Sequence, residues 1–505
     1  MSATLAAVPA SKAHHQQAGL AFWMGRVLEE CDHASVEFAP DPVHDLRVAL
    51  RRCRSMADGL MAMDPDPAWK QMKKAGKRLF GCLGELRDAQ VMKEWVERLG
   101  AVDDPASVRL QHFLSGREGH LKTEAAQALE QFDRKQWKRW SVVLPKRAKR
   151  VRIGGAIFKH LALERWMEGY ELHRRAMRNR SRVAFHSLRI GIKRFRYSVE
   201  NFLPEQHAAW SNDLKHLQDL LGEVHDLDVL WATALQIKAF PDAESRAHWH
   251  AKVAEERSRR IQDYRARMLG EKSLWQVWRK ELPSGPQIEA AALGRLRLWG
   301  SLLDPDSRHS NHVAKLALQL YDGLPARGAG DAEWKQQRAI LQVAALLHDV
   351  GRSKKDDNHH KTTFRLMTQL KPPLGWTTEA MRMAAAVARY HRGSLPRAGQ
   401  EALVGLTPHQ RTAVLRLAGI LRLANAMDAE RDGRIQRVHA HREDHAISIT
   451  AEGYSPRNGM AEKIAAGRHL LETVYRQPIL IKAYRAKTLR RRPRLVVHRP
   501  RRVPA

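Results

Sequence analysis

The chain has 505 residues, of which 43% are hydrophobic, so it has room for two or more domains with their own cores. Its 87 lysines and arginines outnumber its 55 aspartates and glutamates, and the net charge of +32 indicates a polyanionic partner: nucleic acid, an anionic membrane surface or inorganic polyphosphate. Only three cysteines are present (Cys31, Cys53 and Cys82), which argues against a disulfide framework and for a reducing compartment.

Two further classes are disfavoured by the pattern of apolar residues. The first residues show no charged start followed by an apolar run, so we expect no secretory signal. No apolar stretch approaches the roughly 20 residues that a spanning helix needs. We therefore expect a cytoplasmic protein without membrane insertion.

The first predicted domain, 12–282, is helical throughout, because apolar residues recur at intervals of three and four and turn signals are sparse. It reads as two repeats, at about 12–140 and 150–282. The stretch ELPSGPQ contains two prolines, a serine and a glycine, and we place a linker there at 283–287.

The second predicted domain, 288–485, starts with another helical pattern that reaches about Met427. HAISIT and, more weakly, QPILIKAY then alternate apolar residues as strands do. The segment 486–505 is a basic tail that we expect to be at least partly disordered. The sequence thus predicts a mainly α fold, with a duplicated helical bundle followed by a helical domain whose small C-terminal part contains strands.

One cationic helix face occurs twice, in VHDLRVALRRCRS and in FHSLRIGIKRFRYS. Each copy places a histidine and three cations at steps of three, four and three, which is one side of a helix. These residues are His44, Arg47, Arg51 and Arg54 in the first copy, and His186, Arg189, Lys193 and Arg196 in the second. An apolar stripe runs along the other side of each helix. Its residues are Leu46, Leu50, Cys53 and Ala57, then Leu188, Ile192, Phe195 and Val199.

Each cationic row is either a solvated surface or an anion-binding face. Surface helices usually mix signs, since like charges four residues apart are destabilising, yet no acid interrupts either row. The anion-binding interpretation is therefore favoured. A matched segment follows each helix, LGELRDAQV and LGEVHDLDV, with Glu85 and Asp88 answering to Glu223 and Asp226. These acids could orient the arginines or hold a divalent ion, and the lack of a third acid in the first copy favours pairing.

These motifs resemble the CHAD domain, the conserved histidine α-helical domain. The family is built as two helical-bundle halves related by pseudo-two-fold symmetry, and its basic central surface binds inorganic polyphosphate at polyphosphate granules. The resemblance implies that the two cationic rows contact polyphosphate, with Lys73 and Lys77 among the further cations between these elements. One departure is Gln90, which stands where family members often have a second acid.

The second predicted domain has histidines and acids on several helices or at their ends. His348 and Asp349 close an apolar helix in VAALLHDVGRS, and His309 begins an amphipathic helix before them. Adjacent histidine and aspartate can supply two ligands to one divalent ion, with others coming from other helices. Further candidates follow along the chain. They are His359, His360, His391, Arg392, Asn425 and Asp428.

This order is similar to the HD phosphohydrolase superfamily, and in detail to the C-terminal HD-type domain of the exopolyphosphatase/guanosine pentaphosphate phosphohydrolase family. The resemblance implies a metal site at His309, His348, Asp349 and Asp428, possible for Mn²⁺ or Mg²⁺. It implies phosphate contacts at His359, His360, His391 and Arg392. LRLAN places Asn425 where the last aspartate of the family stands, with Asp428 one turn later. The actin-like nucleotidase module that carries hydrolysis in those enzymes is missing here.

The favoured function is inorganic polyphosphate binding, with the second domain as an accessory phosphate-binding module and the protein at polyphosphate granules. Rows of arginine and lysine suit regularly spaced phosphate oxygens, which arginine can engage bidentately. The first alternative is an enzyme, a metal-dependent phosphohydrolase acting on polyphosphate or nucleoside phosphates. The second is nucleic-acid or ribosome binding, which ranks lower because aromatic stacking platforms are lacking on the cationic rows.

Overall fold

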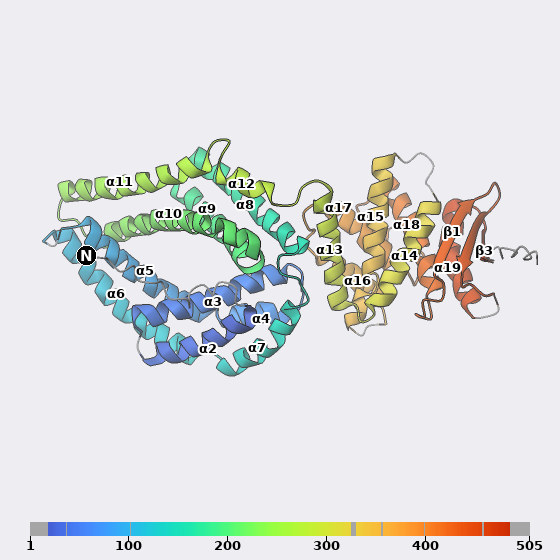
Figure 1. Cartoon of the computed structure of the whole chain (residues 1–505), viewed down its shortest axis with the longest axis horizontal. Helices are drawn as coiled ribbons and strands as arrows, with labels where there is room; N and C mark the ends of the chain where they lie inside the picture. The colour runs from blue at the N-terminus through green and yellow to red at the C-terminus, as the bar shows by residue number, and fades with distance from the viewer. Residues whose placement is uncertain are drawn as a thin grey trace, which may run out of the picture. The chain divides into compact units, whose positions relative to one another are not determined.

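The computed structural model describes residues 19–36, 38–101, 103–324, 330–354, 357–397, 399–456 and 459–484. The predicted start of the first domain at residue 12 and the predicted basic tail 486–505 lie outside this range. The fold is mainly α, with a small three-stranded sheet towards the C-terminus (Figure 1), and this confirms the predicted fold class. The chain divides into two compact units, Met1–Leu302 with Pro373–Trp376, and Leu303–Pro372 with Thr377–Ala505.

The first unit consists of two halves whose helices pack on one another in a similar order. Its first half comprises α2 (Leu20–Val36), α3 (Pro40–Met61), α4 (Pro67–Ala75), α5 (Lys77–Leu99), α6 (Pro105–Glu130) and α7 (Arg134–Ala148). Its second half comprises α8 (Ala156–Asn179), α9 (Arg182–Phe202), α10 (Pro204–Gln236), α11 (Ala243–Met268) and α12 (Leu274–Lys280). α2 packs on α3 and α5 on α6, as α8 packs on α9 and α10 on α11. The halves meet where α3 packs on α9 and α5 on α10.

Several of these helices begin at a side chain that caps them. Ser181 accepts a hydrogen bond from the backbone N–H of Ala184, and Asp104 accepts one from that of Ser107, so each satisfies a free N–H of the first turn. α13 (Pro286–Leu303) follows the break at 283–287. Arg295 of α13 donates to the Ala62 carbonyl and to Glu164, which holds α13 within the first unit.

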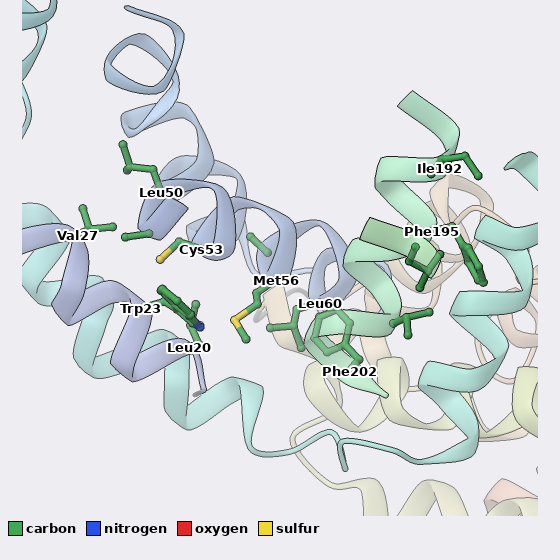
Figure 2. Packing of buried hydrophobic residues seen from close by; sticks show 14 of the residues in the cluster. Leu20, Trp23, Val27, Leu50, Cys53, Met56, Leu60, Ile192, Phe195 and Phe202 are labelled. Carbon is green, nitrogen blue, oxygen red and sulfur yellow. The ribbon is translucent and has the colours of Figure 1, made fainter. Parts of the chain in front are cut away.

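The apolar stripes of α3 and α9 form the centre of the first unit's core (Figure 2). All eight stripe residues are fully buried, so each cationic row is carried by a helix that is fixed from behind. The helices approach closely at Gly59, where an added Cβ would lie 2.2 Å from Cε2 of Phe202. Phe202 in turn stacks on Phe158, with ring centroids 4.1 Å apart. A side chain at position 59 would therefore displace the ring of Phe202.

The second unit is a group of helices followed by the sheet. The helices are α14 (Ser307–Gly323), α15 (Asp331–Leu347), α16 (His359–Gln369), α17 (Thr378–Arg389), α18 (Pro408–Met427) and α19 (Met460–Tyr475), with short 3₁₀ helices η1 (Val350–Lys354) and η2 (Glu401–Leu403). Thr407 and Gln410 form a reciprocal capping box at the start of α18. Among the described helices of both units, none is long and apolar enough to cross a membrane.

The sheet has the order β1-β2-β3, with β1 (Arg437–Arg442) antiparallel to β2 (Ile447–Glu452) and β3 (Ile479–Ala483) parallel to it. β2 and β3 are the two strands predicted from HAISIT and QPILIKAY. β1 was not predicted, because RVHAHR buries only Val438 and Ala440 and its charged residues hide the alternation. Its strand geometry comes from pairing with β2.

Candidate functional site

The two cationic rows lie on α3 and α9, the helices that join the halves of the first unit. Four of their side chains gather there, namely Arg47, Arg51, Arg189 and Lys193, and we call them the cationic face. The guanidinium of Arg51 on α3 lies over the ring of Tyr197 on α9, 5.5 Å from its centroid. This contact brings the two copies of the motif together across the junction.

The charges of the cationic face act on one another. Burial and the neighbouring Arg189, Arg47 and Arg51 lower the pKa of Lys193 to about 7. Burial also lowers the pKa of Arg47, with further contributions from Arg51 and Arg189. The side chains are half-buried, so water screens this repulsion incompletely. The face therefore holds more positive charge than its own surroundings neutralise.

Acids near the cationic face compensate it in part. Asp88, on α5, lies 3.9 Å from Nη2 of Arg47, in line with the pairing interpretation of the LGE segments. Burial, opposed by Arg189, raises the pKa of Asp226 on α10 to about 6. Asp228 is turned to Arg257 and Arg182 instead. Within the described residues, no three-ligand metal group is found in this unit, so these acids provide no candidate metal site there.

The other residues that were predicted to contact polyphosphate differ in their solvent exposure. Arg54 donates to the Lys73 carbonyl, and Lys73 forms an ion pair with Asp58. Arg196 lies 3.7 Å from Glu200. Lys77, the first residue of α5, is exposed. Arg54, Lys73 and Arg196 are therefore engaged in protein contacts.

Two arginines of the cationic face keep unused hydrogen-bonding capacity. Nε of Arg51 and Nε of Arg189 are buried and have no hydrogen-bond partner in the described part of the chain. Buried donors normally find a partner, and an oxyanion is one that two such donors could share. This is the strongest local indication of an anion at the face.

The two motif histidines lie at the edge of the face and are exposed. Burial and the cations Arg51, Arg87 and Arg47 lower the pKa of His44, although Asp45 opposes them. His186 sits beside His225, with their Nδ1 atoms 3.4 Å apart. Burial, with Arg189 and His186, lowers the pKa of His225 to about 4. His225 was not predicted as a site residue, although HDLDV places it where the first copy has Arg87.

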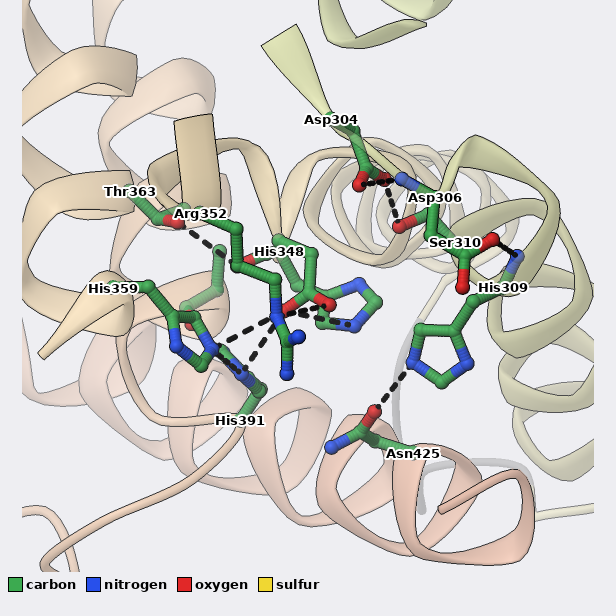
Figure 3. A network of polar contacts seen from close by, with 12 residues as sticks. Asp304, Asp306, His309, Ser310, His348, Arg352, His359, Thr363, His391 and Asn425 are labelled. Carbon is green, nitrogen blue, oxygen red and sulfur yellow. Dashed lines mark hydrogen bonds and ion pairs between the residues drawn. The ribbon is translucent and has the colours of Figure 1, made fainter. Parts of the chain in front are cut away.

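In the second unit, the ends of five helices bring the predicted histidines and acids together (Figure 3). They are His309 in the first turn of α14, His348 and Asp349 after α15, His359 at the start of α16, His391 after α17 and Asn425 in α18. We call His309, His348, Asp349, His359 and His391 the histidine–aspartate cluster. All five side chains are buried.

Asp349 is the centre of the cluster. Its Oδ1 lies 3.2 Å from Nε2 of His359, 3.7 Å from Nε2 of His348 and 3.8 Å from Nε2 of His391. Its Oδ2 binds Nε of Arg352 at 2.9 Å and Nη2 of Arg431 at 2.5 Å. Burial disfavours the charged carboxylate, but the surrounding imidazoles and Arg352 outweigh it and hold the pKa of Asp349 well below its usual range.

Backbone carbonyls fix the orientation of two imidazoles. Nδ1 of His348 donates to the Ala345 carbonyl and Nδ1 of His391 to the Ala388 carbonyl, both at 2.7 Å. Each ring therefore turns its Nε2 lone pair towards Asp349. Burial lowers the pKa of both histidines, although Asp349 opposes this effect. Nε2 of His348 has no hydrogen-bond partner among the described residues.

His309 has both ring nitrogens engaged. Nδ1 lies 2.7 Å from Oδ2 of Asp428, and Nε2 lies 3.0 Å from Oδ1 of Asn425. Asp428 also accepts a hydrogen bond from the backbone of Gly433 at 2.9 Å. Asp428 thus orients His309 from behind, while Asn425 occupies the side that faces the cluster.

Two sets in the described part of the chain have the ligand spacing for a metal ion. One is His309, His348 and Asp349, and the other is Asp349, His359 and His391. The imidazole and carboxylate donors, the fixed ring orientation and the unpartnered Nε2 of His348 all fit a divalent ion. Asp428 is in neither set.

The predicted phosphate contacts separate into two places. His359 and His391 belong to the histidine–aspartate cluster. His360 lies beside it, where burial and Arg389, His359 and Arg392 lower its pKa to about 4. Arg392 is exposed. Arg352 and Arg431, which bind Asp349, were not predicted. The position of Arg352, three residues after Asp349, was a weak sign in the sequence that the two could pair. Arg431 reaches Asp349 only through the tertiary fold.

Two family models match the chain: the CHAD domain over residues 26–235 and the Ppx/GppA phosphatase domain III over residues 301–454. Among solved structures, the crystal structure of the CHAD domain from the plant Ricinus communis is similar at 22% sequence identity and a TM-score of 0.36, over 53% of this chain and 94% of that chain. No curated protein matches.

The first match includes both cationic rows, and the second includes the whole histidine–aspartate cluster. These matches confirm the resemblances to the CHAD domain and to the C-terminal domain of the exopolyphosphatase/guanosine pentaphosphate phosphohydrolase family, and the combination supports a polyphosphate-related role. The chain therefore carries a CHAD domain followed by a Ppx/GppA phosphatase domain III.

Proposed function

We propose that the protein binds inorganic polyphosphate at the cationic face, with the second unit as an accessory phosphate-binding module, and that it gathers at polyphosphate granules in the cytoplasm. The observation that carries this proposal is the uncompensated charge of the face. Burial, together with repulsion from Arg189, Arg47 and Arg51, already lowers the pKa of Lys193 to about 7. A bound polyanion would relieve that repulsion and accept from the free Nε donors of Arg51 and Arg189.

The test is polyphosphate binding by the full chain, measured by calorimetry at several salt concentrations. The affinity should fall steeply as salt rises, because each neutralised phosphate releases counterions, by analogy with nucleic acids. Replacing Arg47, Arg51, Arg189 and Lys193 by glutamate should abolish binding while the helical circular dichroism is kept.

A matched control changes the net charge equally at another place. Lys138, Arg139 and Lys146 on α7 and Lys149, which caps its C-terminal end, are exposed, and replacing all four by glutamate should weaken binding only through long-range attraction. Equal loss of affinity in both folded variants would mean that charge alone, and not the cationic face, determines binding. Preference for single-stranded DNA over polyphosphate would favour the nucleic-acid alternative.

Metal-dependent phosphohydrolysis is the second candidate function, favoured by the donor set around Asp349. When bound, a divalent ion supplies an activated water and holds a phosphoryl oxygen. Phosphate release from polyphosphate or a nucleoside phosphate should then require added Mn²⁺ or Mg²⁺. It should vanish in His348→Ala and Asp349→Ala, with polymer binding by the cationic face preserved. No release under any metal condition would leave the second unit as a binding module.

A further inference from the structure

We infer that a polar cavity in the first unit, lined by residues of α3, α4, α8 and α9, binds a small phosphate monoester with a flat apolar body. The cavity measures about 310 Å³, which is the size of a small-molecule pocket. This site is separate from the cationic face, and the inference does not rest on polyphosphate binding there.

The packing of the helices does not by itself require an open space at this place. In the repeat, Arg194 and Asp58, which line the cavity, correspond to Arg52 and Glu200. The side chains of Arg52 and Glu200 form an ion pair that is only 9% and 4% exposed, and the guanidinium of Arg52 lies 5.2 Å from the ring centroid of Trp23. The side chains of Arg194 and Asp58 are 53% and 54% exposed. One half is therefore filled where the other is open.

Two arginines of the lining share a single acid. Arg165 on α8 and Arg194 on α9 each donate through Nη1 to Glu168, at 3.0 Å and 2.5 Å. Within the described residues this carboxylate is the acceptor that both guanidiniums use, so their Nη2 and Nε groups remain for another one. One carboxylate also cannot neutralise two guanidiniums. A bound oxyanion would supply both the missing acceptor and the missing charge.

Further donors reach the cavity from other sides. Lys73 on α4 is paired with Asp58, which compensates the one acid of the lining, and its ammonium has further N–H groups to donate. Tyr197 on α9 adds a hydroxyl. A phosphate monoester presents three free oxygens to donors on several sides, whereas a carboxylate presents two. The arrangement of the donors therefore favours a phosphate group.

The apolar part of the lining indicates that the phosphate carries an organic body. Phe202 and Leu161 are both buried residues that line the cavity. The ring of Phe202 is held in place by stacking on Phe158, with an interplanar angle of 6°. Gly59 also lines the cavity, and a Cβ at that position would overlap the Phe202 ring. The flat apolar surface that results has no use for inorganic phosphate or polyphosphate, but it suits an aromatic or similarly flat group.

The cavity and the cationic face are neighbours with different residues. None of the four residues of the cationic face lines the cavity. Tyr197 belongs to the lining, and its ring also lies under Arg51 of the face. Binding at the two places can therefore be separated by substitutions on either side of Tyr197.

The experiment is calorimetric titration of the full chain with phenyl phosphate and with adenosine monophosphate, at about 0.15 M salt to limit unspecific attraction. Inorganic phosphate and phenol are the comparison probes. Both esters should bind at one site per chain, and phenyl phosphate should bind at least about tenfold more tightly than inorganic phosphate, because its ring leaves water. Phenol should show no binding. Arg165→Gln and Arg194→Gln should each weaken binding of phenyl phosphate by roughly 10- to 100-fold, because each removes hydrogen bonds between charged groups.

Arg174→Gln is the matched control. Arg174 lies on α8 like Arg165 and pairs with an acid three residues away, Glu171 at 3.4 Å, but it does not line the cavity. This variant should bind phenyl phosphate within about twofold of the unchanged chain. Circular dichroism should show the same helical content in all variants.

Four results would overturn the inference. The first is that neither ester binds the unchanged chain at about 1 mM. The second is equal binding of phenyl phosphate by Arg165→Gln and Arg174→Gln. The third is loss of binding in the double variant Arg47→Gln and Arg189→Gln with retention in Arg165→Gln, which would place the ester on the cationic face. The fourth is equal affinity for phenyl phosphate and inorganic phosphate, which would show that the apolar lining is not used.

Discussion

On the cationic face, four positive side chains share a half-buried junction between α3 and α9, and the nearby acids neutralise them only in part. In the histidine–aspartate cluster, a buried carboxylate is surrounded by two arginines and three imidazoles. The first site is under repulsion until an anion arrives. The second is held together by its own carboxylate. Arginines thus repel neighbouring cations in the first site, whereas they pair with an acid in the second.

Asp349→Ala is the change that should affect the second site most. It removes a buried partner of Arg352 and Arg431, whose own side chains are partly exposed, and losing hydrogen bonds to a charged group costs about 1.5–3 kcal/mol. Urea unfolding should show a lower free energy of unfolding by roughly this amount. An unchanged midpoint would mean that the arginines find water or other partners, and that the cluster is not stabilised by its carboxylate.

The next largest effect should be a pH dependence of polyphosphate binding at the cationic face. Polyphosphate favours a protonated Lys193, whose pKa is about 7 in the free protein. Above pH 7 the protein must take up a proton on binding, so the affinity should fall with rising pH, at most about tenfold per unit. Asp226, with a pKa of about 6, acts in the same direction, since its neutral form below pH 6 no longer repels the polymer.

Calorimetry at pH 6, 7 and 8 measures this effect. Lys193→Arg is the matched control, because its guanidinium stays charged across the range. This variant should lose most of the dependence above pH 7 while it keeps binding. The same slope in both proteins would assign the titration to another group.

Asn425→Asp should raise the metal affinity of the second site by about tenfold. A carboxylate beside Nε2 of His309 would add a fourth ligand to the set of His309, His348 and Asp349, so metal should bind more tightly there. Metal content after dialysis, compared with Asn425→Ser, measures the gain. No gain over the unchanged chain would mean that a carboxylate at position 425 does not bring His309 into a metal site.

The smallest expected effect is a gain of stability at the first site. Lys193→Met removes one charge from a cluster of cations, and relieving such like-charge contacts should raise the free energy of unfolding by roughly 0.5 kcal/mol. Thermal unfolding at low salt checks this, and the gain should shrink as salt is added. A loss of stability would mean that Lys193 is held by favourable contacts, contrary to the repulsion described above.

Much of the fold could be predicted because its signals are local. The apolar stripes of α3 and α9 have helical spacing, and every stripe residue is buried. The cationic rows are repeated in the sequence, and the structure brings Arg51 of one copy to Tyr197 of the other. The histidines of the second unit were predicted to converge from several helices, and they do.

The unpredicted features depend on long-range contacts. Arg431 reaches Asp349 from a turn 82 positions away, and nothing in its neighbourhood marks it as a partner. Sequence order also could not show that Asp428 faces Nδ1 of His309 while Asn425 faces Nε2, because this depends on how α18 is rotated. β1 was missed for a similar reason, since its conformation is imposed by β2.

The buried pair of Arg52 and Glu200 lies where α3 meets α9, and Asn201 and Ser55 extend its hydrogen bonds. By the repeat, Arg194 and Asp58 are the counterparts of Arg52 and Glu200, yet Arg194 binds Glu168 and Asp58 binds Lys73. A polar cavity of about 310 Å³ lies there instead, lined by Asp58, Arg194 and Ser198 among others. The two copies of the motif have therefore diverged at equivalent positions, where one has a buried ion pair and the other has a polar cavity. Two identical copies would not reproduce this junction.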